Sequence, residues 1–203
     1  MNLVGKVSEM IIAIDYDGTI GDANRVKSDW ISAHLGQDVP PWDCNYTDCV
    51  KIIGAEACKQ MGKAAFGREG TLKANEVPGA LAAIKTLCAK GELYVVTARN
   101  HDNIPYAQEW LDDKRLLACF QGFRSSSGTT KAAVCAEIGA DVLIDDDPRH
   151  LCNIEAEGLL KILLQDGRLE RRDCGSDVVF CSDWAEVLTA IDNHRSSSGV
   201  LLA

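Results

Sequence analysis

Residues 11–19 read IIAIDYDGT. The apolar run Met10–Ile14 has the length and the branched residues of a buried strand, and Asp15 and Asp17 follow where it ends. Gly18 permits a sharp turn that keeps both carboxylates near one point. Because ligands of parallel sheets bind at the carboxyl ends of the strands, the pair predicts a site there. An ordinary turn is the alternative, since Asp-Gly is a common turn dipeptide.

Other short apolar runs repeat this pattern and predict further strands at 93–96, 142–144 and 159–164, with 118–123 and 178–181 as additional candidates. Helical periodicity between them predicts helices at 80–90, 104–114, 130–138 and 149–157, the first ending at Gly91 as its C-cap. Strands that alternate with helices of this length indicate an α/β fold, in which a parallel sheet carries helices on both faces.

One interval is too long for a simple crossover between neighbouring strands. Two stretches within it, 26–35 and 50–65, have helical patterns and are joined around Pro40–Pro41. We therefore expect residues 21–75 to form a small, mainly helical cap over the carboxyl edge of the sheet. Residues 1–20 and 76–195 then form the core domain, and 196–203 form a flexible Ser/Gly-rich tail.

A second acidic cluster occurs in residues 142–148, VLIDDDP, again at a strand end. Asp147 before Pro148 fits a helix N-cap followed by proline at the first helical position. Asp145 and Asp146 have no such structural explanation. Carboxylates from two strand ends would repel one another, and a divalent cation with oxygen ligands relieves the repulsion. The combination predicts a Mg²⁺ site.

Two further polar residues stand between the acidic clusters. Thr97 ends the strand predicted at 93–96, where its hydroxyl can donate to a phosphate oxygen, and Lys131 opens a predicted helix. The lysine charge and the helix N-terminus both favour an anion. Taken singly, an ordinary strand-end threonine and a solvated surface lysine explain these two residues as well.

The order of these motifs resembles the haloacid dehalogenase superfamily of phosphohydrolases over roughly residues 10–165. The resemblance implies a Rossmann-like sheet whose insertion after the first strand acts as a cap. It also implies that Asp15 is the nucleophile, that Asp17 is the general acid/base, and that Thr97 and Lys131 bind phosphate.

The same resemblance implies a metal site for Mg²⁺. Its ligands would be Asp15, the backbone carbonyl of Asp17, and Asp146 as the direct ligand from the second cluster, with Asp145 assisting. Because a third aspartate follows, the choice between Asp145 and Asp146 stays open. Asp15 would attack phosphorus and form an aspartyl-phosphate, which water then hydrolyses.

A narrower resemblance to 5′(3′)-deoxyribonucleotidases rests on the segments VPGA at 77–80, YVVTAR at 94–99 and IDD-x-P at 144–148. It implies a nucleoside monophosphate substrate whose base packs beneath the cap, with Ala98 and Arg99 near that substrate. Arg99 either contacts the substrate or orients neighbouring carboxylates. The aromatic residues of the cap, which either stack on the base or form the cap's own core, are Trp30, Trp42, Tyr46 and Phe66. A sugar phosphate or another small ester is the alternative substrate, and a non-catalytic phosphate-binding module is the alternative function.

Composition excludes other classes of partner. The net charge of −9 repels nucleic-acid polymers but not a small phosphate ester at a local cation site. The apolar run at 10–14 is too short for a membrane span. Nine cysteines without a C-x-x-C pair, and no signal peptide, lead us to expect free thiols and a cytoplasmic protein. The Gly-Thr-Thr-Lys stretch at 128–131 lacks P-loop spacing, which excludes a P-loop nucleotide-binding protein. The order of the motifs differs from that of a phosphoacceptor receiver domain, which disfavours that class. The sequence does not determine the oligomeric state.

Overall fold

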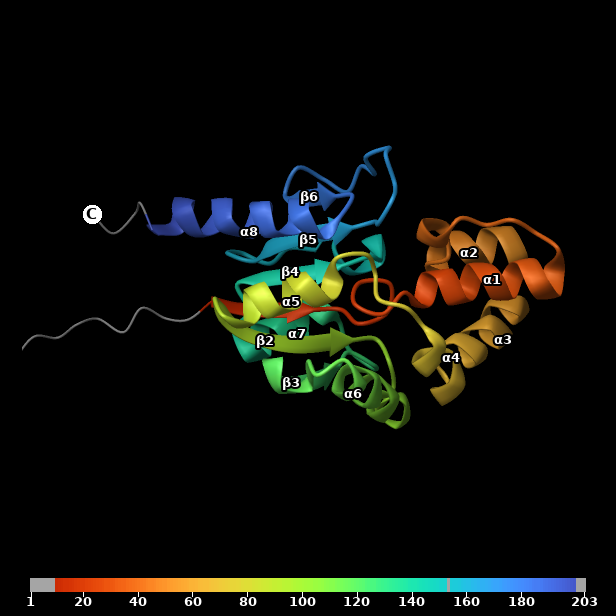
Figure 1. The fold of residues 1–203 in the computed structure, drawn as a ribbon. Coiled ribbons are helices and arrows are strands. Elements are labelled where there is room, and N and C mark those ends of the chain that lie inside the picture. Colours follow the sequence, from red (N-terminus) through yellow and green to blue (C-terminus); the bar gives the residue numbers. More distant parts are fainter. Residues whose placement is uncertain (1–9, 153, 200–203) are drawn as a thin grey trace, which may run out of the picture.

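The computed structural model describes residues 10–152 and 154–199 (Figure 1). Within them, six parallel strands form one sheet in the order β3-β2-β1-β4-β5-β6. The strands are β1 Met10–Ile14, β2 Gly91–Thr97, β3 Phe120–Ser125, β4 Val142–Asp145, β5 Leu160–Leu164 and β6 Val178–Cys181. The predicted α/β class and all six predicted strand positions are confirmed.

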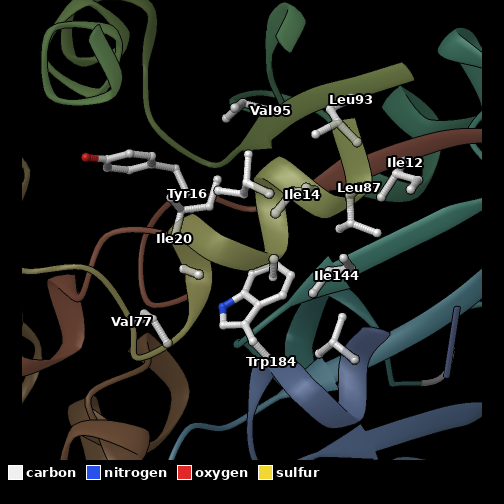
Figure 2. Close-up of a cluster of buried hydrophobic side chains, with 14 of the residues drawn as sticks. Ile12, Ile14, Tyr16, Ile20, Val77, Leu87, Leu93, Val95, Ile144 and Trp184 are labelled. Atoms are coloured by element: carbon white, nitrogen blue, oxygen red, sulfur yellow. The ribbon is translucent and has the colours of Figure 1, made fainter. Parts of the chain in front are cut away.

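Helices cover the two faces of the sheet unequally. On one face, α5 (Ala80–Cys88), α6 (Ile104–Asp113) and α8 (Trp184–Gly199) bury apolar side chains against alternate residues of the central strands. Figure 2 shows part of this cluster, including Leu87 from α5 and Trp184 from α8. On the other face, α7 (Lys131–Ile138) packs with irregular segments. Alternation along each strand places one set of side chains on each face.

The long interval after β1 contains four helices, grouped beyond the carboxyl ends of the strands (Figure 1). They are α1 Ala23–Leu35, α2 Tyr46–Ile53, α3 Ala55–Phe66 and α4 Arg68–Lys73. They have an apolar core of their own, which includes Ile31 and Met61. The single helical stretch expected at 50–65 is divided at Gly54, whose φ of 80° is a left-handed conformation that ends a helix.

Two local predictions are wrong. The described residues of 149–157, which exclude 153, form no α-helix; a short 3-10 turn, η4 (Pro148–His150), has Asp147 as its N-cap, and residues 151–152 and 154–157 are irregular. Helix α5 ends at Cys88, and Gly91 begins β2, where any Cβ would collide with the Met10 carbonyl oxygen. Helix α8 continues to Gly199 and so includes residues 196–199 of the predicted flexible tail, whose flexibility stays a prediction; residues 200–203 lie outside the described residues.

A disulfide bond joins Cys152 to Cys174, so the prediction of free thiols is wrong at these two positions. The bond attaches the loop between β5 and β6 to the segment after β4. Sequence separation and spacing gave no signal for this pair, because the two cysteines meet only through the fold. Among the described residues, no helix has the length and apolar character needed to cross a membrane.

Candidate active site

The loop after β1 begins with buried Asp15 and turns at Gly18. Asp15 is buried at the end of β1, and its backbone N–H donates to the Ile144 carbonyl oxygen of neighbouring β4 at 2.9 Å. Gly18 has a φ of 83°, and a Cβ there would collide with side-chain atoms of Asn24 and Asp146. Glycine is therefore required at this turn by both its backbone conformation and the surrounding space.

Lys131 lies between the two acidic clusters. Its Nζ is 2.8 Å from Asp15 Oδ1 and 2.5 Å from Asp145 Oδ2, and its side chain is 1% exposed. Burial alone would lower the pKa of Lys131, but the adjacent carboxylates of Asp145 and Asp15 raise it above its usual value. The lysine is therefore an ammonium ion held by carboxylates, and the surface-charge alternative is excluded.

Three carboxylates gather at this point, from Asp15, Asp145 and Asp146. One oxygen from each lies within 4.8 Å of the others. Burial, and then repulsion between neighbouring carboxylates, raises the pKa of Asp146 well above its usual value and that of Asp145 to about 7. Three buried carboxylates beside one ammonium form a donor set that suits a divalent cation with oxygen ligands.

In the second acidic cluster, the carboxylates of Asp145 and Asp146 have different hydrogen-bond partners. Asp145 uses one oxygen for Lys131 and the other for the backbone N–H of Asp147, at 2.9 Å. Asp146 accepts a hydrogen bond of 2.5 Å from Asn24 Nδ2 through Oδ2 alone. Its other oxygen remains for a metal, so the geometry favours Asp146 over Asp145 as a direct ligand.

Asp17 does not join the three clustered carboxylates through its side chain. Its Oδ1 and Oδ2 accept hydrogen bonds of 2.7 Å from Arg99 Nη2 and Nε, respectively. The guanidinium also donates to Thr71 Oγ1 of α4 at 2.9 Å and lies over the Tyr16 ring. Of the two roles that the sequence allows for Arg99, contact with the substrate or orientation of neighbouring carboxylates, this ion pair within the core is the second. The bond from Arg99 to Thr71 of the insertion had no sequence signal.

A cavity of about 440 Å³ connects the candidate residues. It is lined by most of the predicted site residues, namely Asp15, Asp17, Thr97, Ala98, Arg99, Lys131 and Asp146. Asp145 is buried beside the cavity through its bond to Lys131. The Thr97 hydroxyl oxygen accepts the Arg99 backbone N–H at 3.1 Å, which leaves the hydroxyl hydrogen to donate elsewhere.

The insertion supplies part of the cavity wall. Tyr46 and Phe66 line it, together with Lys27, which sequence analysis did not identify. Trp30 instead stacks on His34, with ring centroids 4.4 Å apart, and is among the residues packed against the apolar core of the insertion.

A larger cavity of about 630 Å³ lies beside β6 and α8, and none of the three clustered carboxylates lines it.

Comparison with solved structures identifies this architecture. A haloacid dehalogenase-like family hydrolase from Streptococcus pneumoniae matches with a TM-score of 0.62 and 20% identity, over 92% of this chain and 100% of the other. This is the haloacid dehalogenase-like fold. A predicted phosphatase from Clostridium acetobutylicum matches with a TM-score of 0.63 and 15% identity, over 92% and 99% of the two chains.

A haloacid dehalogenase-like hydrolase from Bacillus subtilis, bound to magnesium, matches with a TM-score of 0.56 and 15% identity, over 90% of this chain and 98% of the other. Neither a protein-family model nor a curated protein sequence matches the chain. At these identities the structural likeness establishes the haloacid dehalogenase-like fold, and the activity is argued from the residues of the site.

Proposed function

We propose that this protein is a Mg²⁺-dependent phosphomonoesterase that works through an aspartyl-phosphate on Asp15. One observation carries the proposal: adjacent strands β1 and β4 bring Asp15 and Asp146 together, beside Lys131 in one cavity. Solved hydrolases and phosphatases with this fold support the same conclusion. The cap role of residues 21–75 is part of the proposal, since their helices supply one wall of the cavity.

In the first step, an Asp15 oxygen forms a bond to phosphorus while the bond from phosphorus to the ester oxygen breaks. Lys131 favours the ionised, nucleophilic form of Asp15, and the Thr97 hydroxyl donates to an oxygen of the transferring group. Mg²⁺, held by Asp15, Asp146 and the Asp17 carbonyl, would offset the negative charge of nucleophile and ester.

Proton transfer is the role we assign to Asp17. Both of its oxygens are bound by Arg99, so Asp17 must turn away from the guanidinium to protonate the leaving oxygen. In the second step, the same carboxylate accepts a proton from the water that attacks the aspartyl-phosphate, which releases phosphate and restores Asp15.

The substrate remains a small phosphate ester, and two classes are candidates. Tyr46 and Phe66 in the cavity wall support a nucleoside monophosphate, because aromatic rings can stack on a base. A sugar phosphate is the alternative. Relative kcat/KM values on a panel of both classes decide between them.

The decisive variant is Asp15→Asn, which removes the nucleophile with little change in shape. We expect hydrolysis of an aryl phosphate with Mg²⁺ to fall by more than about 10³-fold, because removing a nucleophile has comparable effects in other hydrolases. Asp38→Asn, an exposed aspartate in the insertion, is the matched control and should keep full turnover. Retained activity in Asp15→Asn contradicts the proposal, and absence of Mg²⁺-dependent turnover in the wild type favours a binding module.

A further inference from the structure

Lys27 is a buried lysine that the proposed phosphoryl-transfer steps do not use. It lies on α1 in the insertion, is 7% exposed, and lines the same cavity as Asp15. Its Nζ donates to Asn24 Oδ1 at 2.9 Å and lies 5.1 Å from the centre of the Phe66 ring. Among the described residues, Lys27 forms no ion pair with a carboxylate within 4 Å.

Burial disfavours an ammonium that no carboxylate contacts directly, and contact with an aromatic face offsets only part of that cost. An ammonium has three N–H donors, and Asn24 accepts only one of them. The other buried cations of the cavity differ in this respect. Lys131 bonds to two carboxylates and Arg99 bonds to Asp17. Burial raises the pKa of Asp146 and the charge of Lys27 partly opposes this, so Asp146 acts on Lys27 from beyond Asn24. No carboxylate among the described residues contacts the Lys27 ammonium directly, and a bound anion could take its remaining N–H donors.

Asn24 fixes where that anion would lie. The side-chain amide of Asn24 accepts from Lys27 and donates to Asp146 Oδ2, so one amide group separates the ammonium from the proposed metal ligand. The phosphoryl group already has Thr97, Lys131 and Mg²⁺ at the sheet edge, whereas Lys27 comes from the insertion. An anion bound by Lys27 would therefore belong to the leaving group.

We infer that the substrate is the phosphate ester of a small acid, whose second anionic group, such as a carboxylate, binds Lys27. This inference rests on the proposed phosphatase function and names a third class of small phosphate ester in place of the two candidates above. A nucleoside monophosphate has no second anionic group for Lys27, and a sugar monophosphate has none either.

The test uses two pairs of esters whose members differ only in the charge of one group. Phosphoglycolate is compared with the analogue in which a neutral carboxamide replaces its carboxylate, and 4-carboxyphenyl phosphate is compared with 4-carbamoylphenyl phosphate. All four esters are assayed with the wild-type enzyme and Mg²⁺. We expect kcat/KM to favour the acid by about 10- to 100-fold in at least one pair, the range for a hydrogen-bonded charge. Lys27→Met, which keeps length and loses charge, should remove this preference, and Lys27→Arg should retain most of it.

Lys59→Met changes an exposed lysine of α3 and is the matched control, in which the acid preference should persist. Thermal unfolding checks that Lys27→Met is folded. The inference is overturned if the wild type shows no acid preference, if Lys27→Met lowers both members of each pair equally, or if nucleoside monophosphates are better substrates than the acids. If no ester is hydrolysed, including aryl phosphates without a second charged group, the result would instead contradict the proposed phosphatase function.

Discussion

The ion pair between Arg99 and Asp17 allows a quantitative test of the site's architecture. The side chains are 1% and 11% exposed, and the guanidinium makes two bonds of 2.7 Å to the carboxylate. Two unit charges about 4 Å apart interact by about 4 kcal/mol at an effective dielectric constant of about 20. Removing one partner of a buried pair costs about 3–5 kcal/mol, because the other charge is left without compensation.

We therefore expect Arg99→Met and Asp17→Asn each to lower the free energy of unfolding by about 3–5 kcal/mol. The double variant leaves neither charge stranded, so its loss should be smaller than the sum of the single losses by at least about 2 kcal/mol. Urea denaturation of all four proteins in EDTA measures this coupling without a contribution from bound metal.

The exposed pair of Arg68 and Glu109 provides the control, since its side chains are 61% and 43% exposed. Arg68→Met should leave the urea midpoint nearly unchanged, because solvent screens such pairs. Additive losses for Arg99→Met and Asp17→Asn would refute the reasoning, since they would mean that the two side chains do not interact when buried.

Two further predictions concern stability. Reduction of the disulfide, or replacement of Cys152 and Cys174 by serine, should lower the free energy of unfolding by about 3 kcal/mol, as expected for a bond that spans 22 residues. Urea denaturation with and without dithiothreitol measures this loss. An unchanged urea midpoint contradicts the prediction. Burial and the nearby Lys131 ammonium lower the pKa of His150 from 6.5 to about 4. The unfolded chain then binds a proton that the folded protein does not, so stability falls as pH drops from 6.5 toward 4, by about 2 kcal/mol between pH 7 and 5. His150→Gln should show a correspondingly weaker dependence in that interval, and an identical slope for both proteins would contradict the assignment.

The sequence predicted those parts of the site that local pattern determines. A buried strand that ends in acidic residues is a strong local signal, which is why Asp15 and Asp146 were found before the structure was known. Thr97 and Lys131 were located by their positions at a strand end and a helix start. These residues share one edge of the sheet because every strand is parallel, and a parallel order follows from the alternation of strands and helices.

Contacts between distant segments had no such signal. The sequence allows Arg99 to orient a neighbouring carboxylate, but its local pattern does not show that the partner is Asp17, 82 residues away. Lys27 lies in a helix of mixed polarity, where a lysine is ordinarily solvated, and only the fold shows that the cavity wall buries it. The helix expected at 149–157 is absent from the described residues of that range, which instead contribute buried Leu151 and the disulfide-bonded Cys152 to that region of the fold.

The neighbouring positions of β1 and β4 have a consequence for the folding of the chain. Each strand contributes one side of the carboxylate cluster, yet Asp15 and Asp146 are 131 positions apart, so their pairing closes a loop that includes the insertion, β2 and β3. Non-local pairing of this kind forms slowly, because loop entropy is lost before the contact stabilises anything. A nascent chain that has not yet reached β4 lacks Asp146, one of the proposed metal ligands, so tight ion binding would report that β1 and β4 have paired.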